Sequence, residues 1–264
     1  MKMSTYHMHT TFSDGENTAE EMILEAIARK CPEIGFSDHA PLPFKETWAM
    51  DEDVVPEYVK TLEALREKYK DKIKVYIGIE QDYYSPEPKW KPDYIIGSVH
   101  YIKHGDDYLP LDLSPSATRE NIEKYYDGDA CAYCEDYYAL VADVYNKTKC
   151  DIIGHFDLII KFNEKLPLID TSAPRYIEAE NKALEALLNT PAHFEVNTGA
   201  ISRGYRTKPY PSEEVIKLIS DNGGKLVLNT DTHSTFSLDM HLDAYARIFD
   251  KVGIRYIKSL DEIL

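Results

Sequence analysis

Histidines and carboxylates recur along this chain in short polar motifs. The first motif is YHMHTTFSDGEN (residues 6–17), in which His7 and His9 stand one residue apart and are followed by Asp14 and Gly15. Imidazole nitrogens and carboxylate oxygens are the protein ligands that hold zinc, manganese or iron. Taken alone, the motif fits a polar strand end, a solvated turn or one wall of a metal site.

Further groups of the same two types follow at intervals. They are His39, Glu80, His100, His155, Asp231 and His233. A lone histidine at a strand end is more often a hydrogen-bonded rim residue than a ligand. With His7 and His9, however, eight such groups fall at six predicted strand ends, which exceeds what one tetrahedral ion uses. The pattern therefore predicts a cluster of two or three metal ions.

The elements that must position these groups alternate along the chain. Short β-branched runs predict strands at residues 4–9, 33–39, 74–82, 94–102, 151–157, 193–197, 225–231 and, less clearly, 254–258. Segments of helical period predict helices at residues 18–30, 55–69, 135–148, 173–189, 212–223 and 242–253. Thr18 and Glu21 have capping-box spacing. Seven or eight such units without a composition break favour one domain over residues 1–264, built as a closed or nearly closed (β/α) barrel.

Three long segments look irregular, at residues 40–53, 104–121 and 197–212, and all follow predicted strands. In barrels of this kind, the loops after the strands build the active-site face. We expect these segments to act as lids and substrate contacts.

Composition narrows the class of partner and the compartment. The formal net charge of −16 would repel a phosphate backbone, which argues against nucleic acid. No apolar run approaches the roughly 20 residues that a membrane helix needs. The first residues contain no signal-peptide core, and the motif CAYC (131–134) lacks a second pair at zinc-finger spacing. We expect a cytoplasmic protein with ordinary thiols and no membrane partner.

The motif series resembles that of a known family. HMH (7–9), SDH (37–39), GIE (78–80), GSVH (97–100), GHFD (154–157) and TDTH (230–233) resemble the ordered motifs of the polymerase-and-histidinol-phosphatase (PHP) metallohydrolases. More specifically, FSDHAPLP (36–43), GSVHYI (97–102) with PLD (110–112) after it, and DIIGHFDLIIKFN (151–163) resemble the monofunctional histidinol-phosphate phosphatases of histidine biosynthesis. The resemblance covers residues 6–233.

This resemblance implies a distorted (β/α)7 barrel of the PHP type with a trinuclear site for two to three divalent ions, zinc, manganese or iron. It implies that His7, His9, Glu80 and Asp231 hold the first metal and that Glu80, His100 and His155 hold the second. It implies that His39 and His233 hold the third, with Asp14 where some relatives supply a histidine. Aspartate is a competent oxygen ligand, but Asp14 in SDG is also typical of a tight turn.

The implied reaction is hydrolysis of L-histidinol phosphate to L-histidinol and phosphate. A hydroxide bridging two of the ions would attack phosphorus in line, and Asp231 or His233 would relay the proton to the leaving group. Lys161, Arg203 and Arg206 are the cations expected to bind the phosphate. Asp38, Phe44 and Trp48 are candidate contacts for the imidazole and amino group.

Three alternatives remain open from the sequence. The substrate could be another small phosphate ester or a phosphodiester. The chain could be a metal-binding module without turnover. A third possibility is an amidohydrolase-type barrel, although no strand-end lysine fits its metal-bridging role. Nothing in the sequence predicts the oligomeric state.

Overall fold

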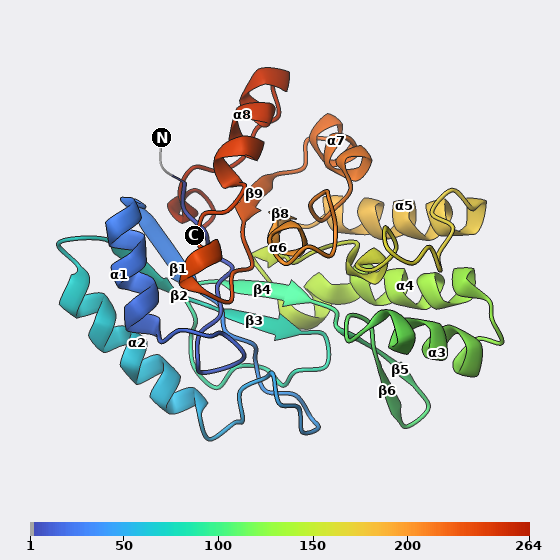
Figure 1. The fold of residues 1–264 in the computed structure, drawn as a ribbon, viewed down its shortest axis with the longest axis horizontal. Helices are drawn as coiled ribbons and strands as arrows, with labels where there is room; N and C mark the ends of the chain where they lie inside the picture. The colour runs from blue at the N-terminus through green and yellow to red at the C-terminus, as the bar shows by residue number, and fades with distance from the viewer. Residues whose placement is uncertain (1–2) are drawn as a thin grey trace.

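The structure is a computed structural model that describes residues 3–264. The elements follow in the order α1 (Ala19–Arg29), β1 (Glu33–Phe36), α2 (Val55–Tyr69), β2 (Lys74–Ile77), β3 (Ile79–Asp82), β4 (Ile95–Ser98), β5 (Tyr101–His104), β6 (Asp107–Pro110), α3 (Pro115–Tyr125), α4 (Ala130–Thr148), β7 (Ile152–Ile153), η1 (Leu158–Ile160), α5 (Pro174–Leu188), β8 (His193–Asn197), α6 (Gly199–Ser202), α7 (Glu213–Asp221), β9 (Leu226–Asn229), η2 (Thr235–Ser237), α8 (Leu242–Val252) and η3 (Leu260–Glu262). Figure 1 shows α1 and α2 beside β1 and β2 at the left of the molecule, with α3, α4 and α5 at the right.

The predicted helices are all present. Thr18 caps α1, and the capping box forms as expected: the Glu21 backbone N–H donates to Thr18 Oγ1, while the Thr18 N–H donates to the Glu21 carboxylate. α4 begins five residues before its predicted start because Asp129 caps it, accepting from the backbone N–H groups of Cys131 and Ala132. None of the helices within residues 3–264 is long and apolar enough to cross a bilayer.

Seven parallel segments form the central ring. β1 pairs with β2, and β3, β4, β7, β8 and β9 pair in that order, all in parallel. β2 and β3 are separated only by Gly78 and together form one strand position, or stave, of the ring. A bridge between His39 and Glu80 extends the pairing of β1 along β3. The remaining gap is filled by residues 4–9.

Residues 4–9 close the ring by bonding to both edges. On one side the Gly35 N–H donates to the Thr5 carbonyl, and the Ser37 N–H donates to the Met8 carbonyl. On the other side Met8 bridges in parallel with Thr232, whose N–H donates to the His7 carbonyl. The protein therefore has the distorted (β/α)7 barrel that the resemblance implied.

Two of the predicted strands differ in the structure. Residues 4–9 are extended but form a single bridge instead of a full ladder, because side chains take some of the backbone donors. The Tyr6 N–H donates to Asn229 Oδ1, and the Met8 N–H donates to Ser37 Oγ. The predicted strand at 254–258 is absent, since only the Ile257 N–H reaches the sheet, at the Leu226 carbonyl.

The segment 104–121 is also not irregular throughout. It completes the antiparallel hairpin of β5 and β6 and contains most of α3. Buried Leu109 and Leu111 anchor the hairpin, and Ser114 caps α3 with Pro115 in the first turn. The many Gly, Asp and Pro residues of this segment made it look irregular in the sequence.

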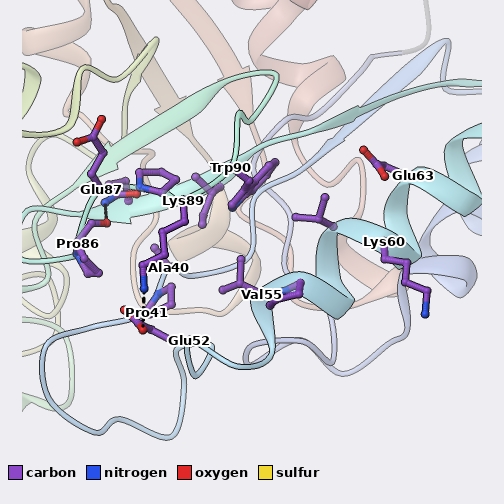
Figure 2. A pocket seen from close by; sticks show the side chains of 15 residues that line it. Ala40, Pro41, Glu52, Val55, Lys60, Glu63, Pro86, Glu87, Lys89 and Trp90 are labelled. Atoms are coloured by element: carbon purple, nitrogen blue, oxygen red, sulfur yellow. Dashed lines mark hydrogen bonds and ion pairs between the residues drawn. The ribbon is translucent and has the colours of Figure 1, made fainter.

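The connection from β3 to β4 contains no helix, unlike an ordinary barrel crossover. A cavity of about 370 Å³ lies where that helix would cover β3, lined by Ala40, Val59, Ile79 and Trp90 among others. Figure 2 shows Trp90 above the first turn of α2, with Lys89 reaching across to Glu52 at 3.1 Å. The outer face of the stave that carries Glu80 is thus covered by a proline-rich loop.

Candidate metal centre

The polar side chains singled out from the sequence meet at one rim of the barrel. His7 and His9 close the segment 4–9, His39 follows β1, and Glu80 lies in β3. The others are likewise placed after strands: His100 after β4, His155 after β7, and Asp231 and His233 after β9. Because all the staves are parallel, their carboxyl ends bring these groups to the same rim.

Glu80 lies at the centre of the cluster and is almost completely buried. Its Oε2 is 3.1 Å from His7 Nε2, 2.8 Å from His39 Nδ1 and 3.6 Å from His9 Nε2. Its Oε1 is 3.0 Å from His155 Nε2 and 3.6 Å from His100 Nε2. The two oxygens of one carboxylate thus face two different sets of imidazoles, which is the arrangement that a carboxylate shared between two ions requires.

A further group surrounds Asp14. Its Oδ1 is 3.6 Å from His39 Nε2 and 3.9 Å from His9 Nδ1, and its Oδ2 is 3.3 Å from His233 Nε2. The ring of His9 lies 4.2 Å from the rings of both His39 and His233, measured between centroids.

The turn at residues 10–15 does not use the side chain of Asp14. The Ser13 and Gly15 N–H groups both donate to the Thr10 carbonyl, and Asp38 accepts from the Thr10 N–H and from Ser13 Oγ. A Cβ on Gly15 would lie 2.5 Å from the His9 carbonyl oxygen, so this position needs glycine. The turn thus leaves the Asp14 carboxylate directed at the histidines.

Unpartnered polar atoms support a metal at this rim. His7 Nε2, both ring nitrogens of His9 and Glu80 Oε2 are buried without a hydrogen-bond partner among the described residues. Such orphaned groups are costly unless something binds them. Three overlapping sets of ligand atoms each lie within 4.8 Å of one another; they are His9, Asp14, His39 and His233; His7, His9 and Glu80; and His39, Glu80 and His100.

The charge states of Glu80 and His9 suit cation binding. Burial alone would raise the pKa of Glu80, but His7, His39 and His100 around it lower that pKa well below its ordinary value. Burial, together with His39 and His233, lowers the pKa of His9 to about 3, so this imidazole is neutral at physiological pH. A neutral imidazole beside an ionised carboxylate is the donor set that zinc, manganese and iron bind.

One buried carboxylate in this region was missed from the sequence. Glu195, in the middle of β8, is completely buried, and its Oε1 lies 2.6 Å from His7 Nδ1. Its Oε2 accepts from the His155 backbone N–H at 2.8 Å. The signal available in HFEVN was the alternation that places His193, Glu195 and Asn197 on one face of the strand and two apolar residues on the other.

A cleft of about 380 Å³ opens above the cluster. Lys161 and Arg203 line it, together with Asp112 and several of the cluster residues. Lys161 Nζ donates to Asp112 Oδ2 at 3.0 Å, and Arg203 Nη2 donates to Asp231 Oδ2 at 2.9 Å. The predicted cations Lys161 and Arg203 are therefore brought to the cleft.

Arg206 is placed elsewhere. Its guanidinium lies 4.5 Å from the ring of Tyr210 and 3.4 Å from the buried carboxylate of Asp157, and it does not line the cleft. The physical reason is that the fully buried Asp157 requires a counter-charge.

The three candidate contacts for the organic part of a substrate also separate. Trp48 lines the cleft, 4.5 Å from the ring of His39. Phe44 packs on Tyr108 outside the cleft, and Asp38 is buried against the 10–15 turn, where it accepts from the Thr10 N–H.

A parallel barrel that gathers imidazoles and carboxylates at one rim defines a metal-binding α/β barrel protein. The family model described as PHP domain matches residues 5–199, and the chain belongs to this family. The family resemblance drawn from the motifs is thereby confirmed.

Named relatives extend over most of the chain. A protein of Schizosaccharomyces pombe named "probable histidinol-phosphatase" is 27% identical over 262 residues, which cover 92% of this chain and 84% of the relative. A solved Listeria monocytogenes structure described as a "putative histidinol phosphatase" is 21% identical, with a TM-score of 0.78 over 92% of this chain and 99% of that one. The histidinol phosphate phosphatase of Lactococcus lactis, solved with zinc, L-histidinol and phosphate, is 23% identical, with a TM-score of 0.69 over 97% and 95% of the two chains. The two structures confirm the fold.

Proposed function

We propose that the protein is a metal-dependent phosphomonoesterase that hydrolyses L-histidinol phosphate to L-histidinol and phosphate. The observation that carries this proposal is the convergence of nine imidazole and carboxylate side chains, with Glu80 at their centre, at the floor of a cleft that also presents Lys161 and Arg203. The names of the S. pombe and L. lactis relatives support the same substrate.

Two to three divalent ions would be held by the residues of the cluster. His7, His9, Glu80 and Asp231 would bind the first ion, and Glu80, His100 and His155 the second. His39, His233 and Asp14 would bind the third. When bound, such ions neutralise phosphoryl oxygens and make water nucleophilic at neutral pH.

The chain's own cations complete the phosphate end of the cleft. Lys161 is 9% exposed and its ammonium is held in place by Asp112, so it meets a phosphoryl oxygen with little further loss of side-chain freedom. Arg203 acts differently. It donates to Asp231 Oδ2 and to the Asp231 carbonyl, and its Nη1 lies 3.0 Å from His233 Nδ1, so its guanidinium orients these two cluster residues.

The other end of the cleft suits an organic cation. Glu46, Trp48 and Tyr101 line it, and Trp48 Nε1 donates to the Tyr101 hydroxyl at 3.2 Å. Burial and the neighbouring Glu46 carboxylate raise the pKa of Tyr101, so its hydroxyl stays protonated. The amino group of histidinol would approach Glu46 while the imidazole rests against the Trp48 ring.

Asp231 and His233 remain the predicted relays of the leaving-group proton. Burial would raise the pKa of Asp231, but Arg203 and His7 lower it well below its ordinary value, so Asp231 enters the reaction ionised. A substrate whose leaving group needs no proton separates the relay role of these residues from their role as metal ligands. With p-nitrophenyl phosphate, an Asp231 or His233 variant that still holds its metal regains most of its rate relative to wild type, whereas a variant that has lost metal does not.

The deciding experiment combines metal analysis with a substrate panel. We expect two to three equivalents of divalent metal per chain, and kcat/KM for L-histidinol phosphate at least a hundredfold above that for p-nitrophenyl phosphate, about 2.7 kcal/mol of discrimination. Equal rates with bis(p-nitrophenyl) phosphate would favour a phosphodiesterase. No hydrolysis of any phosphoester by the metal-loaded protein would reject the proposal.

A further inference from the structure

Four hydrogen-bond donors surround the carboxylate of Glu195. His7 Nδ1 and Asn229 Nδ2 lie 2.6 and 3.0 Å from Oε1. The His155 backbone N–H and Asn197 Nδ2 lie 2.8 and 3.0 Å from Oε2. Each oxygen thus faces two donors, which only a carboxylate, with acceptor sites alone, can satisfy.

Three of these donors cannot be reversed. The His155 N–H belongs to the backbone. Asn229 is fixed because its Oδ1 already accepts from the Tyr6 N–H at 2.7 Å, and Asn197 because its Oδ1 accepts from the Gly199 N–H at 2.8 Å. Neither amide can rotate its oxygen toward Glu195 without breaking a bond to the backbone. Only the imidazole of His7 has a choice of which nitrogen carries its proton.

Glu195 removes that choice. Because the carboxylate only accepts, it holds the proton of His7 on Nδ1. The unprotonated Nε2 then faces Glu80 Oε2 at 3.1 Å and Asp231 Oδ1 at 3.6 Å, inside the cluster. The same carboxylate also accepts a hydrogen bond from the backbone N–H of His155, which follows the neighbouring strand β7. One side chain therefore holds both His7 and His155 of the cluster.

We propose that Glu195 is a positioning residue that sets the metal-binding tautomer of His7 and locks its ring against the backbone that carries His155. This inference rests on the metal centre of the proposed function and not on the substrate. A carboxylate behind a ligating histidine orients the ring and raises its basicity, and its loss typically weakens metal binding about 10- to 100-fold.

Replacing Glu195 by glutamine tests this role directly, because the side chain keeps its size and loses one acceptor oxygen. In Glu195→Gln, either orientation of the amide places an NH2 group against two donors. The least costly arrangement puts the NH2 group opposite His7, where the imidazole can accept from it by moving its own proton to Nε2. The nitrogen that faces the cluster would then carry a proton and could not bind metal.

The experiment measures metal binding without substrate. We expect Glu195→Gln to bind one equivalent of zinc about 10- to 100-fold more weakly in chelator competition, and the spectrum of the cobalt-loaded protein to change. Glu195→Asp, which keeps two acceptor oxygens, should recover part of the affinity. Glu180→Gln is the matched control, because Glu180 is a partly buried carboxylate that hydrogen-bonds Tyr138 and Tyr176 and contacts no cluster residue.

A measurement on the wild-type protein keeps the test independent of folding. In the zinc-loaded protein, ¹⁵N NMR should show the His7 proton on Nδ1, with the signal assigned from His7→Asn. A proton on Nε2, or zinc affinity of Glu195→Gln within threefold of wild type, would overturn the inference. A wild-type protein that binds metal but ignores histidinol phosphate would reject the proposed substrate and leave the role of Glu195 standing.

Discussion

Replacing Lys161 by methionine tests whether the cleft binds a phosphoryl group. Lys161 is 9% exposed, and its Nζ lies 3.0 Å from Asp112 Oδ2 and 3.2 Å from the Asp112 carbonyl. Methionine retains the packed stem and removes only the charge. A hydrogen bond to a charged group contributes about 1.5–3 kcal/mol, so kcat/KM should fall about 10- to 150-fold.

The assay for Lys161→Met is steady-state hydrolysis of L-histidinol phosphate and of p-nitrophenyl phosphate, with inhibition by inorganic phosphate alongside. The loss should be similar for both substrates because they share only the phosphate, and the inhibition constant of phosphate should rise by a comparable factor. Lys165→Met, an exposed lysine four residues further on, is the control. A kcat/KM within threefold of wild type would refute the reasoning.

The same variant also leaves Asp112 without its cation. Burial raises the pKa of Asp112, and Lys161 is the main group that brings it down to about 2. Without Lys161 this pKa should rise and part of the folded-state stability should be lost. The double variant Lys161→Met/Asp112→Asn separates the two effects: it should regain stability but not activity.

Three other outcomes are expected. Chelation of the metals should lower the Tm, since ligand at a hundredfold above its Kd stabilises a fold by about 2.7 kcal/mol; an unchanged Tm would argue against a structural contribution of the metals. Asp14→Ala should lose about one equivalent of metal by elemental analysis, whereas Glu16→Ala, an exposed neighbour, should lose none. Burial and Lys225 lower the pKa of His193 to about 4, so its folded state resists protonation and the stability present above pH 6.5 is lost as pH falls towards 4. Urea unfolding of His193→Gln should show a shallower decline over this pH range, and an equal decline would contradict the assignment.

Much of the site was predictable because the geometry of a parallel barrel determines where side chains at strand ends lie. A histidine or carboxylate at the carboxyl end of a parallel strand must face the common rim, so strand ends such as those at His39 and His100 could be read from the sequence. Loop residues carry no such constraint. Arg203 and Arg206 stand three positions apart in one loop, yet of the two only Arg203 lines the cleft. Arg206 pairs instead with the buried carboxylate of Asp157.

The network behind the ligands was harder to predict for a different reason. Glu195 and Asn229 lie inside buried strands, where their value depends on partners about 190 to 220 residues away, at His7 and Tyr6. No local pattern encodes such pairings. The hairpin of β5 and β6 was missed because its stability comes from Leu109 and Leu111, which belong to the same hydrophobic core cluster as the buried residues of α4, whereas its local sequence is rich in turn residues.

The closure of the barrel by residues 4–9 also governs when the site can form during synthesis. Thr5 bonds Thr230, 225 positions later, and the Met8 bridge likewise awaits Thr232. In a nascent chain the segment can pair early with β1, through the N–H groups of Gly35 and Ser37, but its other edge stays unpaired until β9 and Thr232 have been synthesised. Closing so long a loop is entropically costly and slow, so the ring should be among the last parts to assemble. A chain that stops before Asp231 would lack this ligand and the second edge that holds His7 and His9, so the metal centre can assemble only after β9 has been made.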